Sequence, residues 1–233
     1  MLRWRDGVAH AAQIELAHQV PIAFAYNGVS HVVMLATPGD PSDFALGFSL
    51  SEGVIASPAE CDGVEGRSES AGITLAGRTS YGICGKESLT PVLRPLPDPA
   101  TLATQIVPLA LARAHAGLND RQPMRKSTGA TQGAMFCRPC GTLVLAREGV
   151  GRHNALDNLI GARRCARMLR ADDQPRSCRD GAEDRKCQYR AAGRRFGPAT
   201  PGVRVARDCG LTLISFARGA EFSLFNHPQR IRG

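Results

Sequence analysis

Two apolar runs near the start of the chain are separated by Asn27 and Gly28. Asn-Gly between segments of strand-forming residues is the strongest short-range signal for a two-residue hairpin turn. The pattern therefore predicts paired strands over residues 21–26 and 31–35.

A helix is predicted directly after this hairpin. Asp40 and Asp43 carry short polar side chains of the kind that cap helix N-termini. The apolar residues that follow suit a largely buried helix over residues 44–52, and Gly53 is its expected end.

The later elements follow from the same reasoning. Apolar spacing predicts a helix over residues 102–118, a hairpin with strands at 133–136 and 142–146, a helix that opens at Asn154 and a strand over 211–216. An alternation of strands and helices indicates an α/β protein. We expect an N-terminal α/β part over residues 1–100 and a second part over residues 101–233.

One segment departs from this pattern. Residues 171–202 contain no Val, Ile, Leu or Met. Because such a segment lacks the apolar side chains of an amphipathic helix or a core strand, we expect residues 171–202 to be irregular.

Composition narrows the class of protein. A chain of 233 residues that is 43% hydrophobic can build a sizeable core. It has no run of roughly 20 apolar residues and no apolar signal segment after Met1, so we expect no membrane span and a cytoplasmic location. Much of the arginine behind the net charge of +8 lies after residue 162, so the charge is not taken as a signal for nucleic acid.

The eight cysteines indicate thiols, metal ligands or sulfur chemistry, because the cytosol keeps thiols reduced. The segment 82–86, Gly-Ile-Cys-Gly-Lys, places Cys84 between glycines, where the backbone can turn tightly and expose the sulfur. Lys86 favours the thiolate form. These are the surroundings of a nucleophile, although a small buried loop residue explains the segment equally well.

Two further segments suit anion binding. Residues 148–155, Glu-Gly-Val-Gly-Arg-His-Asn-Ala, follow a predicted strand and open a helix, so that backbone amides, Arg152 and His153 can meet an anion. Residues 216–221 follow the end of another strand, where open α/β sheets bind ligands, and Arg218 can hold a phosphate there. A solvated turn explains the second segment equally well.

Cys137 and Cys140, spaced Cys-x-x-Cys, form one half of a zinc knuckle or a redox pair. No second Cys-x-x-Cys and no His pair follows at a standard spacing. The sequence therefore favours incidental cysteines in a turn.

Six segments of the chain match motifs of one known family and occur in the same order as in that family. They are 26–28 Tyr-Asn-Gly, 34–38 Met-Leu-Ala-Thr-Pro, 43–53 Asp-Phe-Ala-Leu-Gly-Phe-Ser-Leu-Ser-Glu-Gly, 82–85 Gly-Ile-Cys-Gly, 150–157 Val-Gly-Arg-His-Asn-Ala-Leu-Asp and 210–219 Gly-Leu-Thr-Leu-Ile-Ser-Phe-Ala-Arg-Gly. Together they resemble the formate dehydrogenase accessory sulfurtransferases, the FdhD family. The resemblance covers about residues 16–169 and 203–231.

The resemblance implies a cytidine-deaminase-like α/β sandwich, usually a homodimer, with no metal of its own. In this family a cysteine desulfurase passes sulfur to a loop cysteine as a persulfide. The carrier then delivers the sulfur to Mo-bis(molybdopterin guanine dinucleotide), or bis-MGD, before this cofactor enters formate dehydrogenase. Cys84 matches the loop cysteine. The cofactor-binding candidates are Phe216, Ala217, Arg218, Gly219, Ala220 and Glu221, which match the family's nucleotide-contacting stretch, together with Arg152, His153 and Asn154.

The chain departs from the family pattern at several places. Tyr81 stands where the family has the first cysteine of its loop, the stretch ahead of the loop is shortened, and Gly149 stands where the family has Asp. The segment near 176–198 replaces a family helix and strand, and moving its back-translated frame by one nucleotide restores much of the family pattern. We hypothesise a pair of compensating frameshifts there.

Three hypotheses follow. The first is a working sulfur carrier that uses Cys84, and the second is a non-catalytic remnant that at most binds nucleotide or a partner. The third, a zinc deaminase, is disfavoured because the His-x-Glu that should accompany Pro-Cys-x-x-Cys is absent. Tyr81 and the altered segment favour the second hypothesis, whereas the intact segments 152–154 and 216–218 favour the first.

Overall fold

The structure, a computed structural model, describes residues 2–11, 13–61, 63–64, 105–171, 191–193, 200–208, 212–218 and 221–232. It is an α/β protein, as predicted. It divides into two compact units whose segments alternate along the chain. Unit 1 comprises Met1–Gly85, Arg121–Met135 and Ala146–Cys165, and unit 2 comprises Lys86–Asp120, Phe136–Leu145 and Ala166–Gly233. The division expected near residue 100 lies outside the described residues.

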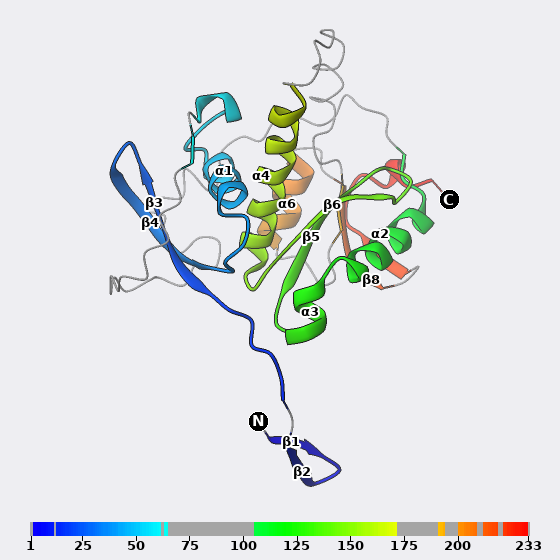
Figure 1. Cartoon of the computed structure of the whole chain (residues 1–233). Helices are drawn as coiled ribbons and strands as arrows, with labels where there is room; N and C mark the ends of the chain where they lie inside the picture. The colour runs from blue at the N-terminus through cyan, green and yellow to red at the C-terminus, as the bar shows by residue number, and fades with distance from the viewer. Residues whose placement is uncertain are drawn as a thin grey trace. The chain divides into compact units, whose positions relative to one another are not determined.

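Unit 1 contains two antiparallel hairpins (Figure 1). β1 (Leu2–Arg5) pairs with β2 (Val8–Ala11), and β3 (Val20–Tyr26) pairs with β4 (Val29–Ala36). Asn27 and Gly28 both have positive φ, 51° and 82°, as a primed hairpin turn requires. The hairpin predicted from this dipeptide is confirmed. The β1–β2 hairpin was not predicted, although its Asp6-Gly7 turn also has positive φ, because each of its strands has only four residues.

The core of unit 1 forms where α1 (Pro41–Glu52) packs on the β3–β4 hairpin. Phe24 of β3 lies edge-on to Phe44, with ring centroids 5.3 Å apart, and stacks on Phe48 at 4.6 Å. Ala36 of β4 completes the buried cluster. Burial of each phenylalanine contributes about 1.5 to 3 kcal/mol, so this cluster fixes α1 to the hairpin.

The ends of α1 bear out one prediction and correct another. Gly53 ends the helix as predicted, with φ 70° and its amide bonded to the carbonyls of the last turn. Asp40 occupies the N-cap position, but it has φ 46° and its side chain makes no capping hydrogen bond. Its carboxylate pairs with Arg147 instead. The helix begins at Pro41, three residues before the predicted start, because proline is well suited to the first helical position.

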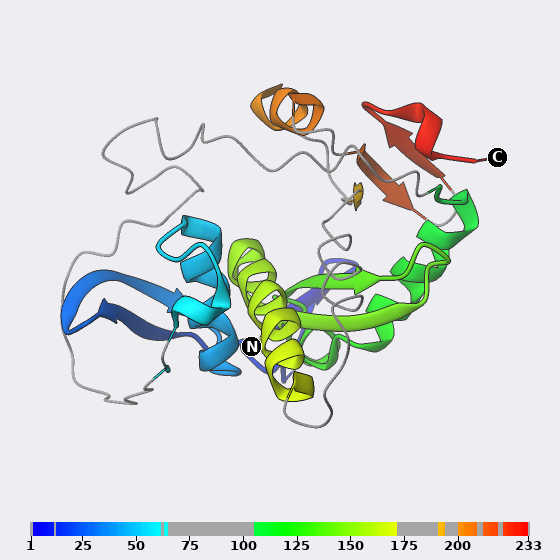
Figure 2. The ribbon, with the colours of Figure 1, turned by 90° about the horizontal axis from the view of Figure 1, so that it is seen from above.

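α4 (Arg152–Ala171) lies beside α1, as Figures 1 and 2 show from two directions. Two glycines bring the helices together. A Cβ on Gly47 of α1 would collide with the backbone carbonyl of Asp157, and a Cβ on Gly161 of α4 would collide with that of Asp43. The two helices therefore pack backbone to backbone, at a distance that no larger residue permits at these positions.

A short helix and a hairpin follow α2 (Pro108–Asp120) in the chain. α3 (Pro123–Thr128) precedes β5 (Gln132–Cys137) and β6 (Leu143–Gly149), which form a two-stranded sheet at the place predicted. The turn of this hairpin belongs to unit 2, whereas its outer ends belong to unit 1.

Unit 2 is built on a three-stranded sheet of β7 (Ala191–Gly193), β8 (Thr212–Arg218) and β9 (Glu221–Leu224). β8 is central, parallel to β7 and antiparallel to β9. α2 (Pro108–Asp120) and α6 (Thr200–Asp208) contact β8, whose Leu213, Ile214 and Ala217 are buried. The strand predicted over 211–216 is confirmed.

Two further expectations concern unit 2. α2 begins at Pro108, later than predicted, because the preceding Ile106 forms a parallel bridge with Ile231. Most of residues 171–202 lies outside the described residues, and the expectation of irregular structure there stays a prediction. Within that range Ala191–Gly193 forms β7 and Thr200 opens α6. In the described ranges no helix combines the length and the apolar character needed to cross a bilayer.

Candidate functional site

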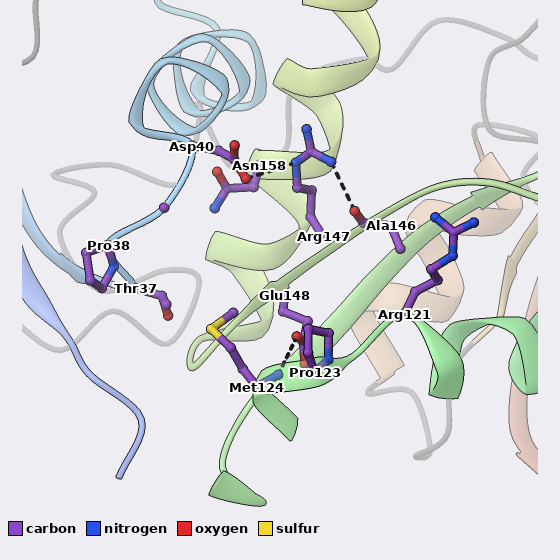
Figure 3. Close-up of a pocket in the computed structure, with 11 residues that line it drawn as sticks. Thr37, Pro38, Asp40, Arg121, Pro123, Met124, Ala146, Arg147, Glu148 and Asn158 are labelled. Atoms are coloured by element: carbon purple, nitrogen blue, oxygen red, sulfur yellow. Dashed lines mark hydrogen bonds and ion pairs between the residues drawn. The ribbon is translucent and has the colours of Figure 1, made fainter. Parts of the chain in front are cut away.

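A cavity of about 300 Å³ lies in unit 1, beside the loop that joins β4 to α1 (Figure 3). Its lining comes from four places in the chain: that loop, the start of α3, the end of β6 and one residue of α4. The lining residues are Thr37, Pro38, Gly39, Asp40, Arg121, Pro123, Met124, Ala146, Arg147, Glu148 and Asn158. Hydrogen bonds of Glu148 to α3 and of Arg147 to α1 hold these segments around the cavity.

Glu148, at the end of β6, is fully engaged within the protein. Its carboxylate accepts hydrogen bonds from the backbone N–H of Met124 and of Arg125, both at 3.0 Å, and from the hydroxyl of Thr131 at 2.9 Å. The two amides belong to the first turn of α3, whose own N-cap residue, Gln122, makes no side-chain cap. Glu148 therefore caps α3 and stabilises its positive end.

Arg147 is held between two carboxylates. Its Nη2 donates to Asp43 Oδ2 at 2.8 Å, its Nε lies 3.4 Å from Asp40 Oδ2, and its Nη1 donates to the carbonyl of Ala146 at 3.1 Å. Two acidic groups thus oppose one guanidinium in the wall of the cavity. The arginine links β6 to the start of α1 and is not available as a free anion ligand.

Asn158 gives the cavity an unused acceptor. Only 4% of this residue is exposed, and its Nδ2 donates to the backbone carbonyl of Asn154 at 3.0 Å. Its Oδ1 is buried and has no partner among the described residues. A buried acceptor of this kind needs a donor from water or from a ligand. The cavity therefore suits a small molecule with an N–H or O–H group, whereas Glu148 and Arg147 serve the fold.

The residues predicted at the start of α4 have different surroundings. Arg152 and His153 are exposed, and their role in ligand binding stays a prediction. Asn154 is 6% exposed, and its Nδ2 donates to the carbonyl of Leu35 at 2.8 Å. Asn154 therefore connects β4 to α4. Nearby, the Val150 amide donates to Thr37 Oγ1 at 3.0 Å and strengthens this connection.

The second predicted segment, 216–221, lies in unit 2 at the β8–β9 connection. The strand register is irregular between Ser215 and Arg218, and Arg218 pairs with Glu221. Phe216 has φ 55° and is 49% exposed, whereas Ala217 is buried. Bulky residues in the left-handed region cost about 1 to 3 kcal/mol and concentrate at functional sites.

Two buried polar groups lie in or next to β8 and β9. Ser215 Oγ is fully buried and has no partner among the described residues, and the same holds for Asn226 Nδ2. Asn226 Oδ1 accepts from the amide of Leu213 at 2.7 Å. The β8–β9 region therefore combines an exposed aromatic ring with spare buried polar groups.

Three predicted site residues lie outside the described residues: Cys84, Gly219 and Ala220. The structure places the 152–154 group in unit 1 and the 216–221 group in unit 2. Sequence reasoning missed the cavity lined by Thr37, Glu148 and Asn158. Thr37 and Glu148 lie in segments that the sequence singles out and Asn158 directly follows one of them, but nothing in their spacing indicated that they share one cavity.

The fold is shared with a solved structure. A crystal structure from Desulfotalea psychrophila, described as that of a candidate formate dehydrogenase accessory protein, superposes with a TM-score of 0.71. It is 19% identical, and the match covers 100% of this chain and 97% of the other. The two proteins therefore have the same α/β fold.

Sequence comparison identifies the family. The family model for FdhD/NarQ matches residues 17–174. The sulfur carrier protein FdhD of Variovorax paradoxus is 37% identical, over 94% of this chain and 87% of its own length. That of Bordetella petrii is 36% identical, over 100% of this chain and 92% of its own length. The chain belongs to the FdhD/NarQ family.

Proposed function

We propose that this protein is a sulfur carrier that takes persulfide sulfur from a cysteine desulfurase and delivers it to bis-MGD for formate dehydrogenase. Its near full-length similarity to relatives named sulfur carrier protein FdhD carries the proposal. The carrier works in the cytoplasm, as the composition leads us to expect, and as a homodimer, as the family resemblance implies.

Cys84 is the proposed sulfur acceptor. Its thiolate attacks the outer sulfur of the desulfurase persulfide, a new S–S bond forms at Cys84, and the desulfurase cysteine leaves as a thiolate. The neighbouring glycines leave room for this attack, and the charge of Lys86 favours the thiolate.

The β8–β9 region is the proposed contact with bis-MGD, which is the cargo of the carrier. The exposed ring of Phe216 is suited to stacking on a guanine base, since aromatic side chains stack on bases regardless of sequence. Ser215 Oγ and Asn226 Nδ2 are buried and have no hydrogen-bond partner among the described residues. Arg218 would supply charge-assisted hydrogen bonds to phosphate.

The acceptor is tested by incubating the full chain with a cysteine desulfurase and cysteine, followed by peptide mass spectrometry. We expect a persulfide on Cys84 and its loss in Cys84→Ser, with Cys61→Ser as the matched control. A wild-type protein that carries no sulfur on Cys84 would instead support the non-catalytic remnant, which Tyr81 favours at the position of the family's first loop cysteine.

The cargo contact is tested by calorimetry with guanosine diphosphate. Arg218→Ala should weaken binding about tenfold or more, because hydrogen bonds to charged groups contribute about 1.5 to 3 kcal/mol. Arg207→Ala, an exposed arginine of α6 in the same unit, is the control. Equal affinities for the two variants would remove Arg218 from the contact while leaving the sulfur acceptor untouched.

A further inference from the structure

The cavity of Figure 3 belongs to a single compact part of the molecule, because all eleven of its lining residues lie in unit 1. Its volume of about 300 Å³ is at the lower end of the range for ligand pockets, about 300 to 1,000 Å³. A small molecule fits this volume, whereas a dinucleotide such as bis-MGD does not. A ligand of this cavity is therefore distinct from the cargo proposed for the β8–β9 region.

The side chain of Asn158 sets one requirement on the ligand. Its Nδ2 donates to the carbonyl of Asn154, and the opposite orientation of the amide would place two oxygens together. The orientation is therefore fixed, and Oδ1 is the atom left without a partner among the described residues. In Figure 3 the amide points toward Asp40. Because the residue is only 4% exposed, this acceptor requires an N–H or O–H donor inside the cavity.

The charge beside Asn158 favours a cationic donor. Arg147 lies 2.8 Å from Asp43 Oδ2 and 3.4 Å from Asp40 Oδ2, so two carboxylates face one guanidinium and leave one negative charge in excess. The side chain of Asp40 is 57% exposed, and its Oδ1 has no partner among the described residues. Charge-assisted hydrogen bonds to a carboxylate are stronger than neutral ones, so an ammonium group suits this corner better than a hydroxyl.

Arg121 gives the cavity a positive side. Figure 3 shows it across the cavity from Asp40, with Pro123 and Met124 along the wall between them. Arg121 is exposed and forms no ion pair within the part of the chain that the structure describes. A guanidinium in this position is suited to a carboxylate on the ligand.

We propose that this cavity binds a small amino acid. The ammonium group donates to Asn158 Oδ1 and to the Asp40 carboxylate, and the carboxylate of the ligand accepts from Arg121. Arg147 and Glu148 hold the walls through their own hydrogen bonds and do not need to contact the ligand. This site does not rest on the sulfur-carrier function, because none of its residues belongs to the Cys84 loop or to the β8–β9 region.

The test is nuclear magnetic resonance titration of the ¹⁵N-labelled full chain. The probes are alanine, β-alanine and 4-aminobutyrate, which differ in the separation of the two charges. We expect at least one of them, at millimolar concentration, to shift the amides of residues 37–40 and 147–148 and to leave those of β8 unchanged. Butyrate lacks the amine and should bind at least about tenfold more weakly than the best probe, because it leaves the Asn158 acceptor unpaired.

Two mild substitutions assign the two ends of the ligand. Asp40→Asn removes the charge but keeps a residue type that tolerates the left-handed φ of 46°, and it should weaken binding of the best probe about fivefold or more. Asp6→Asn is the matched control, because Asp6 is also exposed, also has a left-handed φ, 51°, and does not line the cavity.

Arg121→Gln should weaken binding of the amino acid and leave binding of butylamine, which has no carboxylate, unchanged. Lys126→Gln, an exposed cation of α3 outside the cavity, is its control. Asn158→Leu should abolish binding, and the circular dichroism spectrum checks that this variant still folds; if it does not, Asp40→Asn decides. The proposal is overturned if no probe shifts these amides, if butyrate binds as tightly as the amino acids, or if Asp40→Asn leaves the affinity unchanged. In each of these cases an ordered water on Asn158 is sufficient.

Discussion

Asp157 is a buried carboxyl that the fold holds away from water. It lies on α4 against α1, and its Oδ1 accepts a hydrogen bond from Ser51 Oγ at 2.7 Å. Burial raises the pKa of Asp157 to about 6, although the bond from Ser51 acts in the opposite direction. An aspartate in the unfolded chain has a pKa of about 3.9. The folded state therefore binds more protons than the unfolded state between these two values.

The sign of the pH dependence follows from this difference. The contribution of Asp157 to stability is fully present below about pH 4 and is lost as the pH rises through about 6. Asp157→Asn keeps an acceptor for Ser51 and removes the charge. It should stabilise the protein at pH 8 by about 1 to 3 kcal/mol, given 1.36 kcal/mol for each unit of pKa, and change little at pH 4.

Urea unfolding between pH 4 and pH 8 measures this effect. Asp120 is an exposed carboxyl at the end of α2. Asp120→Asn is therefore the matched control and should leave the pH dependence of the free energy of unfolding unchanged. If Asp157→Asn destabilises the protein equally at pH 4 and pH 8, ionisation of Asp157 is not what the fold opposes.

Among the elements, α3 depends on a side chain from outside its own sequence. Glu148→Ala removes the acceptor for two amides of the first turn and for Thr131. The free energy of unfolding should fall by about 2 to 4 kcal/mol, because the variant loses an N-cap and a hydrogen bond to a charged group. Glu148→Gln keeps one acceptor oxygen and should lose about half as much. Thermal and urea unfolding compare the two, and equal losses would show that charge alone matters.

The contact between α1 and α4 depends on glycine. Gly161→Ala places a Cβ against the carbonyl of Asp43 and should cost about 1 to 3 kcal/mol through forced displacement of the helices. Gly117→Ala in α2 is the control, because its Cβ would meet only the Leu143 side chain at an ordinary 3.5 Å. There the better helix propensity of alanine should stabilise by up to about 1 kcal/mol. Urea unfolding measures the stability of both variants. An unchanged free energy of unfolding in Gly161→Ala would contradict close packing of the two helices.

Local patterns predicted elements well where the chemistry was local. The Asn27-Gly28 turn, the Gly53 helix end and the hairpin through 137–141 all depend on residues that lie close together in the sequence. The Asp40 cap failed because its carboxylate pairs with Arg147, more than a hundred residues away. The cap of α3 and the cavity acceptor on Asn158 were missed for the same reason: each depends on a partner that only the fold supplies.

At the scale of the whole molecule, unit 1 draws on three separate stretches of chain. A fragment of residues 1–100 contains α1 but lacks α4, so the glycine face of α1 has no partner. We expect this fragment to expose apolar surface and unfold without cooperativity, whereas residues 1–233 unfold cooperatively. Circular dichroism during urea titration tests this, and a cooperative transition in the fragment would establish residues 1–100 as a folding unit.

The separation of Gly47 from Gly161 also bears on synthesis. Ribosomes add about 5 to 20 residues per second, so on the order of ten seconds passes between the emergence of α1 and that of the α4 residues that cover it. During this interval the phenylalanine cluster can form on the β3–β4 hairpin, but the opposite face of α1 remains open to water. The nascent chain is therefore a natural client for chaperones at the ribosome exit. Its yield in a cell should depend on translation speed between these two glycines more than on speed elsewhere.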